Sequence, residues 1–200
     1  LTPSSSASDV YQSQLLSLIV LLPQFDVEPA AAARVWREQH ERAIVDEFVE
    51  LLSIPNVSRD RKNIVRNAEW IVKAFGKRGV KMQLLRVRGA SPAVFGEIKR
   101  EGATRTLIFY AHYDGQPVDV SRWPHDPFEP VLYDKSIADG GKRIPLPEPG
   151  ARFDPESRLY ARSAGDDKAP IIAILAALDA LRAAKITPRA NLKFFFEGEE

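Results

Sequence analysis

Residues 105–115, RTLIFYAHYDG, form an apolar run that ends in a histidine and an aspartate. The stretch from Arg105 to Ala111 lacks polar alternation, which predicts a strand buried on both faces. His112 and Asp114 follow at its carboxyl end, where open α/β sheets place their ligands. Because alternate residues of an extended chain point the same way, we expect the imidazole and the carboxylate to share a face.

This His-x-Asp pair has two interpretations. In the first, the imidazole binds a metal ion and the carboxylate fixes the tautomer of the ring from behind. In the second, both side chains are solvated at the end of a surface strand, which is common for so short a motif. The choice depends on which other polar residues reach the same edge of the sheet.

Helical and strand patterns alternate along the rest of the chain. Periodic apolar positions predict helices over 31–53 and 61–77, and an apolar, Ala-rich helix over 168–184. Strands are predicted at 80–87, 94–98, 105–111, 159–161 and 190–196. A hairpin-like loop at Glu101–Ala103 is expected to join the second and third strands. These patterns predict a three-layer α/β/α sandwich with a mixed, mainly parallel sheet.

Two acidic clusters follow later strands. Asp166 and Asp167 precede the apolar helix, where a single aspartate would suffice as a helix cap. Two adjacent carboxylates repel each other unless a cation neutralises them, as a carboxylate bridging two metal ions does. The second cluster comprises three glutamates after the last strand: Glu197, Glu199 and Glu200. We expect the Phe-rich strand before them to be buried and to deliver these acids into a cleft.

The composition narrows the chemistry. Lys and Arg number 28 against 27 Asp and Glu, a net charge of +1, so no global field attracts nucleic acid or an anionic membrane. The chain has no cysteine, which excludes disulfides, thiolate zinc sites and cysteine nucleophiles. No apolar run approaches the roughly 18 residues of a membrane span. A small-molecule or peptide substrate and a metal held by His, Asp and Glu are therefore expected.

Two segments stand apart from this pattern. Residues 1–30 are interpreted as a leader or linker, and the domain proper is expected from residue 31. Their apolar run, Leu15–Pro23, suits a secretory leader, an irregular extension or a buried first helix, and the first of these favours a periplasmic or secreted protein over a cytoplasmic one. Residues 115–157 are rich in Pro, Gly and Asp, and we expect this long segment to roof a site.

Taken in order, the three motifs resemble the zinc-dependent peptidases and deacylases. This family includes carnosinase-type dipeptidases, glutamate carboxypeptidase, acetylornithine deacetylase and succinyl-diaminopimelate desuccinylase. The resemblance covers about residues 35–200 and rests on His-x-Asp, Asp-Asp-Lys and Glu-Gly-x-Glu. Residues 115–128 look like the dipeptidase branch. The resemblance implies a zinc-exopeptidase-like fold, of which residues 31–200 form the amino-terminal part of the catalytic domain.

The resemblance also implies roles for individual residues. His112 is expected to bind one zinc ion, and Asp166 to bridge two, with Co²⁺ or Mn²⁺ as substitutes. Asp114 is expected to orient His112, and Glu200 to act as the general base. An alternative register makes Glu199 the base and Glu200 a ligand. The peptide bond between Asp166 and Asp167 is typically cis in this family.

The sequence departs from the family pattern around the bridging aspartate. Glycines of the family are replaced by Ala161, Ser163 and Ala169, and Gly165 stands where alanine, serine or threonine is usual. None of these is a ligand position, so they bear on the shape of the loop more than on its chemistry. The resemblance further implies that the remaining metal ligands and a lid-like domain, which often dimerises, lie beyond Glu200. By itself the chain is therefore expected to have little or no activity.

The expected reaction is hydrolysis of a peptide or amide bond by metal-activated water. A dipeptidase or carboxypeptidase is the first interpretation, acting on small peptides as a homodimer. Alternatives are a deacylase of N-acyl amino acids and a non-catalytic binding protein on the same fold. No Gly-x-Ser-x-Gly motif or other nucleophile pattern competes with the metal interpretation.

Overall fold

The computed structural model of the protein describes residues 28–200. Its helices and strands are α2 (Pro29–Leu52), α3 (Arg61–Gly76), β1 (Lys81–Leu85), β2 (Ala93–Ile98), β3 (Thr106–His112), β4 (Val131–Tyr133), β5 (Arg158–Tyr160), α4 (Ala169–Ala183) and β6 (Asn191–Glu197). Short helical turns are η1 (Val120–Arg122), η2 (Ile137–Asp139) and η3 (Ala164–Lys168). Every predicted helix and strand is present, with ends displaced by one to a few residues. The interpretation of residues 1–27 as part of a leader lies outside the described residues.

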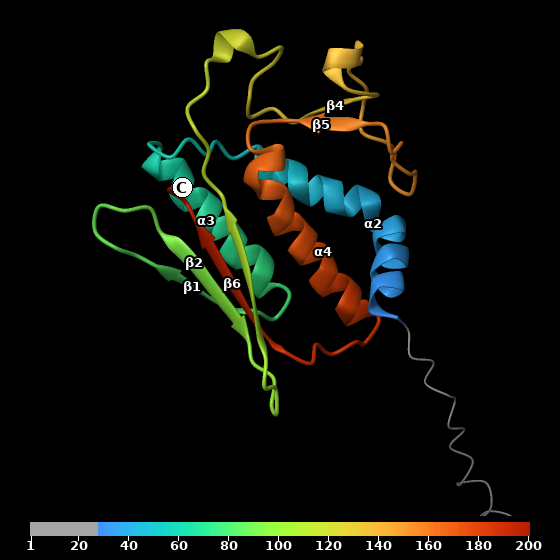
Figure 1. Ribbon diagram of the computed structural model, residues 1–200. Coiled ribbons are helices and arrows are strands. Elements are labelled where there is room, and N and C mark those ends of the chain that lie inside the picture. The colour runs from blue at the N-terminus through green and yellow to red at the C-terminus, as the bar shows by residue number, and fades with distance from the viewer. Residues whose placement is uncertain (1–27) are drawn as a thin grey trace, which may run out of the picture.

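The main sheet has the order β1-β2-β6-β3 and is mixed (Figure 1). This confirms the α/β class, but the prediction of a mainly parallel sheet is wrong for the described strands. Only β3 and β6 are parallel, whereas β1 with β2 and β2 with β6 are antiparallel. The short connection between β1 and β2 allows only the antiparallel arrangement, because a parallel pair needs a long crossover.

The predicted hairpin between β2 and β3 does not form, because β6 lies between these strands. In register, Phe194 of β6 faces Gly96 on one side and Phe109 on the other. The Phe-rich strand therefore takes the central position, where it is best buried. Strand β3 lies at the edge of the described sheet, and the prediction that it is buried on both faces is wrong for the described residues. Its side chains at Leu107, Ile108 and Tyr110 are 54%, 68% and 51% exposed.

The core lies between one face of the sheet and helices α3 and α4. The ring of Phe75 in α3 packs at 5.2 Å from Phe194 and 5.1 Å from Phe196, measured between centroids. Ile171 and Leu175 of α4 are buried in the same cluster. Helix α2 packs along α4 (Figure 1). Among residues 28–200 helices cover this face alone, so the described residues form two of the three expected layers.

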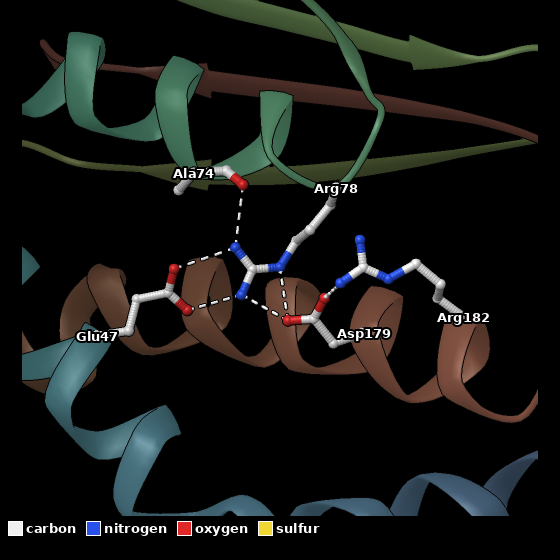
Figure 2. Close-up of polar contacts among 5 residues, drawn as sticks. All are labelled: Glu47, Ala74, Arg78, Asp179 and Arg182. Atoms are coloured by element: carbon white, nitrogen blue, oxygen red, sulfur yellow. Dashed lines mark hydrogen bonds and ion pairs between the residues drawn. The ribbon is translucent and has the colours of Figure 1, made fainter.

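A largely buried arginine ties the three long helices together (Figure 2). Arg78, just after α3, contacts Glu47 of α2 and Asp179 of α4 at 2.8 Å and 2.6 Å, and it also donates a hydrogen bond to the carbonyl oxygen of Ala74. Burial alone would lower the pKa of Arg78, but the hydrogen bonds that it donates to both carboxylates, together with their negative charges, outweigh burial and raise the pKa. We call Arg78, Glu47 and Asp179 the Arg78 clamp.

The long segment 115–157 contains β4, which pairs with β5 just after the segment in a small sheet beyond the ends of α2 and α4 (Figure 1). Its later part contacts α2. Arg152 pairs with Glu38 at 2.9 Å, and the amide of Phe153 donates to Glu41 at 3.1 Å. This part of the segment therefore packs against a helix, whereas we expected it to roof a site. None of the helices within residues 28–200 has the length and apolarity to cross a bilayer.

Candidate metal centre

Strands β3 and β6 run parallel as neighbours, so their carboxyl ends meet at one edge of the sheet. His112 is in register with Glu197, and the amide of Tyr113 donates to the carbonyl oxygen of Glu197 at 2.8 Å. Residues 198–200 continue from β6 beside the loop that follows His112. Two of the three predicted motifs are thus adjacent because their strands are paired.

The third motif reaches the same place through η3. The Nε2 atom of His112 lies 2.9 Å from Oδ1 of Asp166, within hydrogen-bond distance. The imidazole is largely buried, whereas the side chain of Asp166 is 87% exposed. A buried ring therefore presents one nitrogen to a carboxylate at the rim of the sheet.

Asp114 lies on the other side of the His112 ring. Its Oδ1 atom is 3.4 Å from Nδ1 of His112, and this buried nitrogen has no well-formed hydrogen bond among the described residues. The side chain of Asp114 is 2% exposed, and it also accepts a hydrogen bond from the amide of Glu200 at 3.4 Å. Asp114 thus lies where it could orient the imidazole from behind, and its role as a residue outside the ligand shell stays a prediction.

The two terminal glutamates point to different partners. Oε2 of Glu200 lies 3.7 Å from Nε2 of His112. Glu199 instead accepts a hydrogen bond from the amide of Ser91 at 3.0 Å, and this bond lowers the pKa of the Glu199 carboxyl. The geometry therefore favours the register in which Glu200 faces the site and Glu199 does not.

Acidic groups dominate the electrostatics around His112. Burial lowers the pKa of the imidazole, but the hydrogen bond to Asp166 and the charges of Glu200, Asp114 and Asp166 together raise it. Three carboxylates thus surround a single side chain that can carry a positive charge. One imidazolium cannot neutralise three carboxylates, so a further cation beside them would be electrostatically favourable.

The donor atoms suit a zinc ion. Zinc accepts imidazole nitrogen and carboxylate oxygen, and the 2.9 Å between Nε2 of His112 and Oδ1 of Asp166 is short enough for both to approach one ion. Within residues 28–200 no set of three or more His, Asp and Glu side chains forms a complete metal-binding group. The residues present therefore fit part of a zinc shell.

The loop that carries Asp166 has an unusual backbone. The Asp166–Asp167 peptide bond is cis, as the resemblance led us to expect. Ser163 stands where the family has glycine and has a φ of 62°, a left-handed conformation that glycine adopts more readily. Ser163 therefore adopts the left-handed conformation although it carries a side chain.

Sequence reasoning missed two residues next to the centre, Lys168 and Asn56. Lys168 is fully buried and donates hydrogen bonds to the carbonyl oxygens of Leu51 and Ile54, at 2.9 Å and 3.0 Å. Burial lowers the pKa of Lys168 to about 7. Asn56 is also fully buried and donates to the carbonyl oxygen of Tyr113 at 2.9 Å. The Asp-Asp-Lys motif was the only signal that pointed to Lys168, and none identified Asn56.

Comparison with known proteins gives a consistent result. Residues 108–200 match the model of Peptidase family M20/M25/M40. The chain is 30% identical over 172 residues to the Cys-Gly metallodipeptidase dug1 of Schizosaccharomyces pombe, which covers 78% of this chain and 32% of the relative. It is 32% identical over 110 residues to the Beta-Ala-His dipeptidase of Homo sapiens, covering 54% of this chain and 17% of the relative.

Solved structures show the same fold. The di-peptidase Dug1p from Saccharomyces cerevisiae superposes with a TM-score of 0.65 at 19% identity, covering 84% of this chain and 34% of that one. The M20 family metallo-carboxypeptidase Sso-CP2 from Sulfolobus solfataricus gives 0.60 at 30% identity, covering 78% and 31%. The chain thus spans about a third of the length of these proteins, and the predicted resemblance to this group of peptidases is confirmed.

Proposed function

We propose that this chain, a relative of the M20/M25/M40 peptidases through residues 108–200, is the amino-terminal part of the catalytic domain of a two-zinc dipeptidase. The observation that carries the proposal is the approach of His112 to Asp166 at 2.9 Å, with Asp114 behind the ring and Glu200 in front of it. Three motifs that are far apart in sequence meet at one point. Their side chains supply the donors that zinc prefers.

Each residue then has a role. His112 would hold one zinc ion and Asp166 would bridge two, with Co²⁺ or Mn²⁺ as substitutes. Zinc, when bound, acidifies a water molecule and polarises the scissile carbonyl. Glu200 takes the proton from the attacking water and returns it to the leaving amine, because its carboxylate overlooks the site and is 61% exposed. Asp114 keeps the imidazole of His112 in the ligating orientation.

The substrate class is a short peptide. Two relatives are named for Cys-Gly and Beta-Ala-His, both of them dipeptides. We extend this preference to the protein that carries this chain, together with the homodimer implied by the resemblance. The nearly neutral net charge of +1 gives no reason to add nucleic acid or a membrane surface as partners. A deacylase of N-acyl amino acids is the alternative, because the same amide chemistry serves both substrates.

A metal-exchange assay tests the proposal. The protein that carries this chain is stripped with a chelator, reloaded with Zn²⁺ or Co²⁺, and assayed on Cys-Gly, Beta-Ala-His and N-acetyl amino acids. We expect dipeptide hydrolysis to disappear on chelation and to return with either metal. Hydrolysis that persists without metal would contradict the metal mechanism. Turnover of the acylated amino acids alone would instead identify the deacylase, and binding without turnover the non-catalytic protein.

A Glu200→Gln variant tests the general base. The amide cannot accept the proton, so we expect kcat to fall by about 100- to 10,000-fold while the protein still binds zinc. The matched control is Glu199→Gln, whose side chain bonds to Ser91 and does not face His112. If Glu199→Gln abolishes turnover and Glu200→Gln does not, the alternative register is correct.

A further inference from the structure

Residues 51–58, at the end of α2 and the start of its connection to α3, contact both loops that carry the proposed metal ligands. One loop follows β3 and contains His112. The other runs through η3 and contains Asp166. The segment reaches the His112 loop through its own side chain Asn56, and the Asp166 loop reaches the segment through Lys168. Both side chains are fully buried.

The contact with the Asp166 loop consists of two hydrogen bonds from the side chain of Lys168 to backbone carbonyl groups. The ammonium of Lys168 donates to the carbonyl oxygens of Leu51 and Ile54, at 2.9 Å and 3.0 Å. Carbonyl groups in the last turn of a helix lack partners within the helix, and a cation is favourable at this end of the helix dipole. Lys168 is only two residues from Asp166, so these bonds hold the backbone of the ligand loop against the end of α2.

The contact with the His112 loop uses the backbone as well. The side chain of Asn56 donates to the carbonyl oxygen of Tyr113 at 2.9 Å, and the carbonyl oxygen of Asn56 accepts from the amide of Gly115 at 2.8 Å. The amide of Ser58 donates in turn to Gly115 at 3.2 Å. These bonds enclose the residues on both sides of Asp114.

The two ligand loops also touch each other at Gly115. A Cβ atom on Gly115 would stand 2.5 Å from Oγ of Ser163, which precedes η3, and 3.4 Å from Nδ2 of Asn56. The two loops and residues 51–58 therefore form one closely packed unit. A displacement of this segment would move both loops.

We infer that residues 51–58 set the spacing between His112 and Asp166, with Lys168 and Asn56 as the positioning residues. This inference rests on the proposed function, because it assigns Lys168 and Asn56 to the binding of zinc by the same centre. Neither side chain is expected to touch the metal or the substrate. Each acts on a ligand through the backbone that carries it.

The test measures zinc affinity of the full-length apo protein by competition with a chromophoric chelator. Lys168→Met removes the ammonium at similar length, and Asn56→Ala removes the amide on the other loop. We expect each to weaken zinc binding by roughly 10- to 100-fold, the usual cost of losing a group that orients a ligand. The control is Asp179→Asn in the Arg78 clamp, which lowers stability without contacting the centre and should bind zinc like the wild type.

The outcomes separate the two proposals. Zinc affinity that is unchanged in both Lys168→Met and Asn56→Ala overturns the positioning role, as does an equal loss in Asp179→Asn, which would trace the effect to stability alone. If Lys168→Met does not fold, the zinc affinity of Asn56→Ala decides whether the positioning role holds. A wild-type protein that binds no zinc, or a His112→Ala variant that binds it as well as the wild type, overturns the proposed function itself.

Discussion

The Arg78 clamp and the His112 centre are both clusters of charged side chains, yet their charges are balanced differently. In the clamp, Arg78 contacts Glu47 and Asp179, and Arg182 beside the clamp pairs with Asp179, so two cations meet two anions (Figure 2). In the centre, His112 is the one basic side chain that pairs with these acids among residues 28–200, whereas three acids surround it: Asp114, Asp166 and Glu200. The clamp is electrically complete, and the centre is not.

We interpret this difference as the one between a structural cluster and a proposed binding cluster. Partly buried charges are tolerated in a fold when each has a partner, as in the clamp. Carboxylates gathered without enough cations raise the free energy of the folded chain, and a metal ion relieves this cost when it binds. The comparison therefore predicts that substitutions in the clamp lower stability, whereas substitutions in the centre lower metal affinity.

The largest expected effect on stability is that of Arg78→Met. The variant leaves the carboxylates of Glu47 and Asp179 largely buried without their shared cation, which should cost about 3 to 5 kcal/mol of unfolding free energy. Urea unfolding of the apo protein measures it. Zinc affinity of the folded fraction should not change. A loss below about 1 kcal/mol, typical of exposed ion pairs, would show that the clamp is not a structural unit.

The same chemical change can be made in each cluster. Asp166→Asn removes a proposed bridging ligand, so zinc affinity should fall by more than the roughly 100-fold upper range for residues that only orient ligands. Because the side chain of Asp166 is 87% exposed, apo stability should change by less than about 0.5 kcal/mol. Asp179→Asn should instead lower the stability of the apo protein and leave its zinc affinity unchanged. Equal behaviour of the two variants in both assays would remove the distinction between the clusters.

The sequence predicted the members of the centre better than the sheet that supports them. His112, Asp114, Asp166 and Glu200 were identified because each motif follows a strand, and the structure brings them together. Strand pairing was predicted less well, because the short loop after β2 suggested a hairpin while β6 inserts between β2 and β3. Local pattern does not encode which later strand occupies the centre of a sheet.

Lys168 and Asn56 show a second limit. Lysine is rarely fully buried, so nothing in the sequence suggested that Lys168 is enclosed against the end of α2. Asn56 begins the pattern Asn-Val-Ser, a glycosylation sequon that occurs often by chance. In the fold its side chain is fully buried against Tyr113. Both roles depend on contacts between segments more than 50 residues apart, which a single sequence does not reveal.

Asp114→Asn sharpens the description of the centre. The carboxylate lies 3.4 Å from Nδ1 of His112, where the amide of Asn would orient the ring less firmly. We expect zinc affinity to fall by roughly 10-fold, toward the lower end of the range for residues that orient ligands. Apo stability should not decrease, because the variant removes a buried acid that no full cation balances. A marked loss of stability in the apo protein would instead place Asp114 among the structural charges, with the clamp.

The smallest effect is expected at Asp60, an acid that belongs to neither cluster. Asp60 precedes α3 and accepts hydrogen bonds from the amide and side chain of Asn63, which lower the pKa of its carboxyl from 3.8. Asp60→Ala should cost about 1 kcal/mol at pH 7 through loss of this cap. Because the pKa is lowered in the folded state, the stabilisation is complete above pH 3.8 and is lost as the pH falls through the lowered value. Urea unfolding of the wild type and the variant, at pH 7 and at acidic pH, measures the cost of the substitution and its dependence on pH. A cost that persists at acidic pH would mean that Asp60 caps α3 equally well when its carboxyl is protonated, and that its negative charge contributes nothing to the stability of the fold.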